Sequence, residues 1–265
     1  MRLESSRRTS AGHQPSAAGA RRAAMAIEWA SLGWFLLERP VSSRQSQRCP
    51  STPGTEALDS ELQYELRVQF APIEEVFLVR HGETEWNRTG RRQGQLDAPL
   101  TESGLAEMQW VAERIGSLPI DGVFSSPLGR AISTAQAYAQ TLRQTITTID
   151  DLRELNHGDM AGMTNDEIER AFPGELTQRS RDKYQWRFPK GESYADANLR
   201  AATALRQIAE SGRLRPLIVT HEMIGRMILR NLLDLEPQEA LRLGLNHKKI
   251  YQVHVESKTV TEITL

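Results

Sequence analysis

Short apolar runs alternate along the chain with segments whose apolar residues recur every three or four positions. The runs lie at 76–79, 122–125, 145–149 and 217–219, and they are rich in β-branched and aromatic residues. The helical stripes between them are Leu105, Met108, Ala112 and Ile115; Ile132, Ala135, Ala139 and Leu142; and Leu199, Ala202, Leu205 and Ile208. We expect strands at the runs and helices at the stripes, with these residues on the inner faces.

Capping residues and chain turns add further elements. Thr164 and Glu167 have the spacing of a capping box, which predicts a helix that continues to Phe172. Ser193 is expected to cap the helix with the third stripe, and another helix should begin near Ile224. The runs at 250–255 and 260–265 are joined too tightly for a crossover, so we expect an antiparallel pair at a sheet edge.

This order of elements indicates the fold class. Strand–helix alternation with fully apolar strands requires helices on both faces of the sheet. The chain is therefore expected to form an α/β fold: a three-layer, doubly wound, mostly parallel sheet with helices on both faces. We assign this domain to residues 73–265.

Residues 1–72 have a different composition. Arg, Ser and Ala dominate the first two dozen residues, and Pro, Ser, Gln and Arg dominate from 40 to 55. Such a composition is typical of a disordered or weakly ordered extension. An acid-poor, Arg-rich start also suits an organelle-import peptide. A third interpretation is that a start codon upstream of Met25 has been wrongly assigned.

Overall composition excludes several function classes. The formal net charge of −1 provides no general attraction for nucleic acid or for a membrane surface, so neither is expected as a partner. The one cysteine, Cys49, excludes an intrachain disulfide and a cysteine-rich zinc site. The longest apolar run, 26–37, is too short to cross a bilayer. We expect a cytoplasmic protein, with organelle import as the alternative.

Three predicted strands end in residues that can hold an anion. Ligands bind at the carboxyl ends of strands in a doubly wound sheet, so side chains that follow different strands should meet there. These strand ends are Arg80-His81-Gly82, Thr220-His221-Glu222 and Ser125-Ser126-Pro127, the last with Arg130 at the start of the next helix.

This residue set matches the needs of a phosphomonoester. Arg80 and Arg130 can pair with phosphate oxygens and take the place of magnesium, so no metal and no cofactor is expected. A neutral His81 imidazole can attack phosphorus if its other nitrogen is held by an acceptor. We expect a cationic His221 to stabilise the transferred group. Taken singly, however, a histidine after a strand is usually structural, and the other histidines (His13, His157, His247, His254) indicate no role.

The strand-end residues belong to a recognisable set of ordered blocks. These are Leu78-Val79-Arg80-His81-Gly82-Glu83-Thr84 with Trp86-Asn87; Arg92-Gln93-Gly94 with Pro99-Leu100-Thr101 and Gly104; Ser125-Ser126-Pro127-Leu128 with Arg130 and Thr134-Ala135; Leu152-Arg153-Glu154 with Gly158 and Gly162; and Val219-Thr220-His221. Over roughly residues 74–265 the sequence resembles the histidine phosphatase, or phosphoglycerate mutase-like, superfamily.

The resemblance assigns roles that spacing alone does not. It implies a phosphohistidine on His81 and a phosphate held by Arg80, Arg130 and His221. It also implies Glu154 as the proton donor, since a nearby dianion favours its protonated form, and Asn87 as a further phosphate contact. Gln93 and Gly94 are expected to contact substrate as part of the second block.

A second set of residues resembles the fructose-2,6-bisphosphatase branch. There, the residues matching Arg179, Lys183, Tyr194 and Arg226 hold the substrate's second phosphate; a solvated basic segment is the alternative. Two departures put strict bisphosphate specificity in doubt. Glu222 replaces the usual glutamine and would repel an anion unless it pairs, for example with Arg226. Asn165 replaces a tyrosine that contacts substrate in that branch.

These observations predict a metal-independent phosphatase for small phosphorylated metabolites, with sugar phosphates as the expected class. The alternatives are a cofactor-dependent phosphoglycerate mutase and a non-catalytic binding module with the same fold. The expected partner is a small phosphorylated substrate, and the protein is expected to be a monomer or a homodimer.

Overall fold

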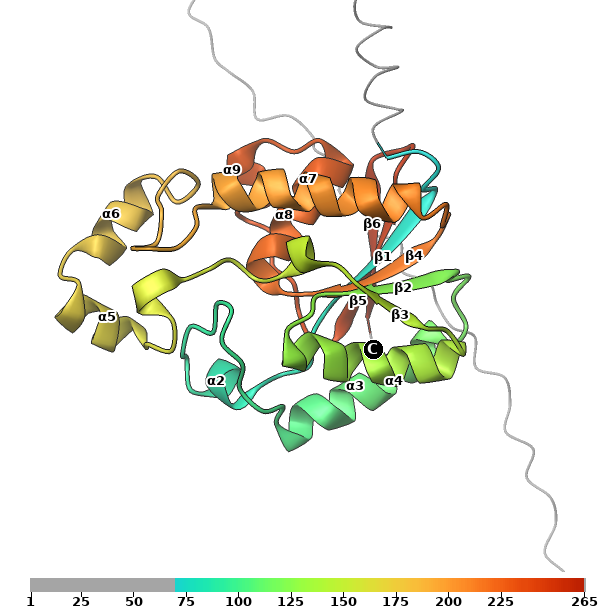
Figure 1. Ribbon diagram of the computed structural model, residues 1–265, viewed down its shortest axis with the longest axis horizontal. Coiled ribbons are helices and arrows are strands. Elements are labelled where there is room, and N and C mark those ends of the chain that lie inside the picture. The colour runs from blue at the N-terminus through green and yellow to red at the C-terminus, as the bar shows by residue number, and fades with distance from the viewer. Residues whose placement is uncertain (1–69, 265) are drawn as a thin grey trace, which may run out of the picture.

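The computed structural model describes residues 70–264 (Figure 1). The predicted extension at 1–72 lies almost entirely outside the described residues. Within 70–264, no helix combines the length and apolar character needed to cross a membrane.

A six-stranded sheet forms the centre of the molecule, with strand order β3-β2-β4-β1-β5-β6. The strands are β1 (Glu75–Arg80), β2 (Gly122–Ser125), β3 (Ile146–Thr148), β4 (Pro216–Thr220), β5 (Lys249–His254) and β6 (Thr259–Thr264). The first four in spatial order are parallel, and β5 and β6 are antiparallel at one edge. The predicted mostly parallel sheet and its antiparallel edge pair are confirmed.

Helices cover both faces of the sheet, as Figure 1 shows. On one face lie α3 (Glu102–Ile115) and α4 (Gly129–Leu142); on the other lie α7 (Tyr194–Glu210), α8 (Glu222–Leu233) and the short α9 (Pro237–Ala240). Alternate residues of β1 enter the two cores: Val76 and Leu78 pack with α7 and α8, and Phe77 and Val79 pack with α3 and α4. The three-layer, doubly wound prediction is confirmed.

One residue in each of two predicted helical stripes lies outside the buried face, while most of the other residues of both stripes are buried as predicted. Leu199 is 70% exposed and Leu105 is 44% exposed, although both were expected to face inward. The buried face of α7 carries mainly alanines instead, at 197, 201, 204 and 209, together with Leu205 and Ile208. Small residues allow α7 to pack closely on α8, so side-chain size along the sequence is a poor guide to the inner face here.

The remaining short elements lie mostly at the carboxyl ends of the parallel strands. They are α2 (Glu85–Arg88), α5 (Asn165–Ala171) and α6 (Glu175–Arg181), with the 3-10 turns Asp150–Leu152 and Gly158–Met160. Figure 1 shows α5 and α6 extending away from the sheet beyond α2. The predicted caps are confirmed: Thr164 and Glu167 form a capping box on α5, and Ser193 caps α7.

Candidate active site

The two histidines that follow strands meet because β1 and β4 are neighbours. Arg80 lies opposite Thr220 in the parallel ladder, and the His81 amide donates to the Thr220 carbonyl at 2.9 Å. The ring centroids of His81 and His221 are 5.1 Å apart. The two imidazoles therefore lie close together at the carboxyl ends of β1 and β4, as predicted.

Two hydrogen bonds define the tautomer of His81. Arg130 Nε, which can only donate, lies 3.2 Å from His81 Nε2, so this nitrogen carries the lone pair. The protonated Nδ1 donates to the Gly82 carbonyl at 2.8 Å. Burial lowers the pKa of His81 well below its usual value, and the charges of Arg130 and Arg80 lower it further. His81 is thus held as a neutral imidazole whose unprotonated Nε2 accepts a hydrogen bond from Arg130.

Arg130 begins the first turn of α4 and is buried. Its Nη1 donates to Asp97 Oδ1 at 2.8 Å and to the Leu96 carbonyl at 2.7 Å, and its Nη2 donates to the Gly94 carbonyl at 2.8 Å. Burial lowers the pKa of Arg130. These contacts orient the guanidinium so that its Nε faces His81.

Arg80 is held by a carboxylate that it shares with Arg226. Glu222 Oε2 lies 2.8 Å from Arg80 Nη1, and Glu222 Oε1 accepts a hydrogen bond from Arg226. Arg80 Nη1 also donates to the Leu245 carbonyl at 3.1 Å. The carboxylate that replaces the usual glutamine is therefore paired, which offsets the repulsion expected between Glu222 and an anionic ligand.

His221 accepts or donates a hydrogen bond at Nε2, which lies 2.8 Å from Ser126 Oγ. Burial lowers its pKa well below the usual value, and Arg130 lowers it further. Without a phosphate, burial and the neighbouring guanidinium both favour the neutral ring, and the cationic His221 expected beside a phosphate stays a prediction.

Glu154 is buried, and its carboxylate is fixed by backbone donors at the start of α8. Its Oε1 accepts from the amides of Leu155 at 2.9 Å and Ile224 at 3.0 Å, and its Oε2 accepts from the Met223 amide at 3.1 Å. The helix N-terminus therefore positions this carboxylate.

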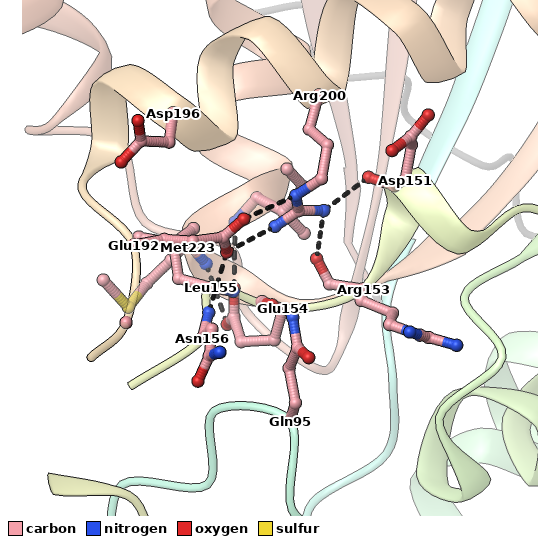
Figure 2. A network of polar contacts seen from close by, with 12 residues as sticks. Gln95, Asp151, Arg153, Glu154, Leu155, Asn156, Glu192, Asp196, Arg200 and Met223 are labelled. Carbon is pink, nitrogen blue, oxygen red and sulfur yellow. Dashed lines mark hydrogen bonds and ion pairs between the residues drawn. The ribbon is translucent and has the colours of Figure 1, made fainter. Parts of the chain in front are cut away.

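The loop that carries Glu154 is tied to α7, as Figure 2 shows. Arg200 donates to the carbonyls of Asp151 at 2.7 Å and Arg153 at 3.0 Å, and it forms two hydrogen bonds with Glu192. Glu192 in turn accepts from the Asn156 amide at 2.8 Å. This network places the loop without using a side chain of the phosphate site.

Three predicted substrate contacts, Asn87, Gln93 and Gly94, come from the first two sequence blocks, and each has a different environment. Asn87 Oδ1 accepts from the Thr84 amide and hydroxyl at 3.1 and 2.9 Å, which caps α2, so a phosphate contact would have to come from its amide nitrogen. Gly94, at φ +55°, turns its carbonyl onto Arg130. Gln93 is buried, and its Oε1 has no partner among the described residues.

The residues predicted to hold a second phosphate also converge, around Tyr194. Arg226 Nη1 donates to the Tyr194 hydroxyl at 2.8 Å, and Lys183 Nζ lies 5.8 Å from the Tyr194 ring centroid. Arg179 lies over the rings of Trp186 and Phe188 at 6.0 and 5.8 Å. Burial, followed by the charges of Arg226 and Arg179, lowers the pKa of Lys183 to about 8.

Two neighbours of His81 were not identified in the sequence. His247 Nδ1 hydrogen-bonds to the His81 carbonyl, and the two rings are 5.5 Å apart. Burial and Arg80 lower the pKa of His247 to about 4. Thr134 Oγ1 accepts from the Gly82 amide at 3.0 Å. Thr134 belongs to the third block and could have been found there, whereas no local pattern distinguishes His247.

The sequence matches one known protein family over nearly all of the described residues. The family described as "Histidine phosphatase superfamily (branch 1)" matches residues 76–264. The chain belongs to the histidine phosphatase superfamily. Members of this superfamily are phosphatases or mutases, and this histidine phosphatase is accordingly an enzyme.

Over the aligned residues, two curated relatives are more than a third identical to this histidine phosphatase. The probable phosphoglycerate mutase GpmB of Proteus mirabilis is 38% identical over 190 residues, which are 69% of this chain and 86% of that relative. The protein of the same name from Yersinia pestis is 37% identical over 183 residues, or 68% and 84% of the two chains. The match shows the superfamily and does not single out the fructose-2,6-bisphosphatase branch, which stays a prediction.

Solved structures share the fold of this protein, and two of the following three are phosphatases by name. A mycobacterial glucosyl-3-phosphoglycerate phosphatase in complex with VO3 aligns with a TM-score of 0.62 at 25% identity, over 72% of this chain and 97% of that one. Bacillus stearothermophilus YhfR aligns with a TM-score of 0.64 at 27% identity, over 72% and 95%. A putative alpha-ribazole-5'-P phosphatase from Escherichia coli shares the fold, with a TM-score of 0.67 at 20% identity over 73% and 96%.

Proposed function

We propose that this protein hydrolyses small phosphorylated metabolites, with sugar phosphates as the substrate class, through a phosphohistidine on His81. The observation that carries the proposal is the arrangement at His81 Nε2. This nitrogen is unprotonated, lies 3.2 Å from Arg130 Nε and belongs to a ring 5.1 Å from that of His221. A neutral nucleophile next to fixed cations is what in-line attack on a phosphomonoester requires.

The reaction takes place in two steps. In the first, His81 Nε2 bonds to phosphorus while the bond to the ester oxygen breaks, and Glu154 in its acid form gives its proton to that oxygen. The Gly82 carbonyl, which accepts from Nδ1–H at 2.8 Å, stabilises the positive charge that develops on the ring. In the second, water attacks the phosphohistidine, the Glu154 carboxylate takes its proton, and inorganic phosphate leaves.

Arg80 and Arg130 neutralise the phosphoryl oxygens throughout. Both guanidinium groups are largely buried, which strengthens their interaction with a dianion relative to the same pair in water. Asn87, Gln93 and Gly94 complete the predicted phosphate pocket. His221 then acts as a neutral hydrogen-bonding partner until the phosphate arrives, and the dianion favours its protonation.

The cations around Tyr194 support a substrate with a second anionic group. The cluster consists of Arg179, Lys183 and Arg226, and Glu222 contributes by orienting Arg226. This arrangement supports a fructose-2,6-bisphosphatase-like preference, although the branch itself remains a prediction.

The decisive experiment compares His81→Ala with the matched variant His254→Ala, whose histidine lies half-buried on β5 and pairs with Glu75. With a ³²P-labelled substrate, quenched wild-type and His254→Ala protein should carry acid-labile, alkali-stable label. His81→Ala should carry none and should lose at least about 1,000-fold in kcat/KM. Retention of more than a few per cent of activity in His81→Ala would contradict the nucleophile assignment, and a dead wild-type protein would favour the non-catalytic alternative.

Phosphoglycerate mutase activity is the second candidate, because the curated relatives at 38% and 37% identity are named as probable mutases. Incubation with 3-phosphoglycerate separates the two activities. A phosphatase releases inorganic phosphate, whereas a mutase forms 2-phosphoglycerate with little phosphate release. A panel that includes fructose-2,6-bisphosphate and sugar monophosphates then ranks substrates by kcat/KM.

A further inference from the structure

Arg92 lies in the loop after α2, beside the cations that surround Tyr194, although none of the predicted substrate contacts includes it. Its backbone is fixed on both sides: the Arg92 amide donates to the Met163 carbonyl at 3.0 Å, and its carbonyl accepts from the Gly162 amide at 2.7 Å. The guanidinium is partly buried, and Arg179 lies near enough, together with burial, to lower its pKa. The loop therefore holds the Arg92 backbone in place, and the side chain is only partly exposed to solvent.

Asn165, the first residue of α5, holds the Arg92 guanidinium. Arg92 Nη2 donates to Asn165 Oδ1 at 2.9 Å, while Arg92 Nε is buried with no partner among residues 70–264. Asn165 thus supports a guanidinium, and a cation is held at the start of α5.

Among residues 70–264, most of the positive charge near Tyr194 has no paired carboxylate; Arg226, which pairs with Glu222, is the exception. Within residues 70–264, neither Arg92, Arg179 nor Lys183 forms a salt bridge. The nearby carboxylate of Glu222 is already shared by Arg80 and Arg226. Partly buried cations with no counter-charge are costly unless an anion completes the site.

The neighbouring Arg91, in the same loop, has a structural role. It forms two hydrogen bonds with Glu167, at 2.6 and 2.9 Å, and one with the Gly162 carbonyl at 2.7 Å. Arg91 is thus fully engaged in attaching the loop to α5. Within the part of the chain that the structure describes, the Arg92 side chain has one neutral partner and an unused Nε–H, which is the donor that a ligand oxygen would take.

We propose that Arg92, held by Asn165, binds the distal group of the substrate and makes the site selective for a second phosphate over a carboxylate or a hydroxyl. This inference rests on the proposed phosphatase function and specifies its substrate class as a compound with two phosphate groups. A phosphate dianion offers several oxygens and two negative charges to Arg92, Arg179 and Lys183, whereas a carboxylate offers two oxygens and one negative charge. The difference in charge favours the phosphate.

The test measures kcat/KM for fructose-2,6-bisphosphate, 3-phosphoglycerate and glucose 6-phosphate. In Arg92→Gln, the ratio of kcat/KM for the bisphosphate to that for glucose 6-phosphate should fall by about tenfold or more. Arg92→Lys should retain a ratio between those of Arg92→Gln and the wild type. Arg170→Gln is the matched control, because it removes one positive charge from the exposed surface of α5 and should leave the ratio at the wild-type value.

A binding measurement keeps this inference separate from the catalytic proposal. Calorimetry with the His81→Ala protein and fructose-2,6-bisphosphate should give tighter binding than with glucose 6-phosphate, and adding Arg92→Gln should remove most of that preference. If the wild-type protein hydrolyses none of the compounds but this preference is present, the proposed function fails and the Arg92 inference holds. An unchanged ratio or an unchanged binding preference in Arg92→Gln overturns the inference.

Discussion

At the scale of single residues, the chemistry depends on one nitrogen atom and on what holds its partners. Arg130 is a donor only, so its contact with His81 Nε2 keeps that nitrogen unprotonated. Asp97 accepts from Arg130 Nη1 at 2.8 Å and from the Gly129 amide at 2.8 Å. It thereby fixes the guanidinium and the start of α4 together, although its side chain is 43% exposed and need not contact substrate.

We predict that Asp97→Asn lowers kcat by roughly 10-fold or more while KM changes less, since the neutral amide holds Arg130 less firmly in the transition state. Steady-state kinetics with the best substrate of the panel measures the split. Asp234→Asn, an exposed carboxylate paired with Lys258, serves as the control. Equal kcat in wild type and Asp97→Asn would show that Asp97 has no positioning role.

At the scale of elements, the site is assembled by segments that approach the carboxyl ends of β1, β2 and β4. The loop with Glu154 is placed by α7 through Arg200 and Glu192 and by the first turn of α8 (Figure 2). Gly158 completes this junction: its φ is +50°, and a Cβ there would lie 1.9 Å from the Pro189 carbonyl oxygen. Close backbone approach at this position requires glycine.

We predict that Arg200→Met destabilises the protein by about 3 kcal/mol, because it leaves Glu192 largely buried without its partner. It should also lower kcat through a displaced Glu154. Urea unfolding measures the first effect and kinetics the second. Adding Glu192→Gln should recover part of the stability. A protein with wild-type stability and kcat would argue against this role for the α7 network.

At the scale of the whole molecule, the fold buries imidazoles in neutral form. His157 stacks on Phe188 with ring centroids 4.4 Å apart, and burial, then Arg92 and Arg179, lower its pKa to about 3. The pKa values of His81 and His221 are lowered as well. Below the ordinary histidine pKa of about 6.5, the unfolded chain binds protons that the folded protein does not. Stability should therefore fall as the pH falls through this range.

We predict that the free energy of unfolding decreases between pH 6.5 and 5, and that His157→Phe makes this decrease shallower. Each such histidine contributes up to about 1.4 kcal/mol per pH unit once the unfolded state is protonated. Urea unfolding at several pH values measures the slope. The same slope in wild type and His157→Phe would mean that His157 takes up its proton without unfolding.

Local sequence determined the sheet, most helix starts and the main strand-end residues. Apolar runs, caps and the residues after strands are properties of short segments, so the α/β class, the caps at Thr164 and Ser193 and the approach of His81 to His221 could be predicted. The five blocks also indicated the superfamily. The inner face of α7 could not be read in the same way, because the deciding contacts are with α8 and not within the helix.

Only the tertiary structure decided how distant residues pair. Glu222 on Arg80, His247 on the His81 carbonyl, and Arg92 on Asn165 each join segments that no local period or motif connects, whereas Glu222 and Arg226 are one helical turn apart and could be paired from the sequence. The electrostatic consequences follow from burial as well as from charge. The neutral state of His221, and the cations near Tyr194 that form no salt bridge within residues 70–264, depend on which side chains the fold removes from water, and a list of residues does not contain that information.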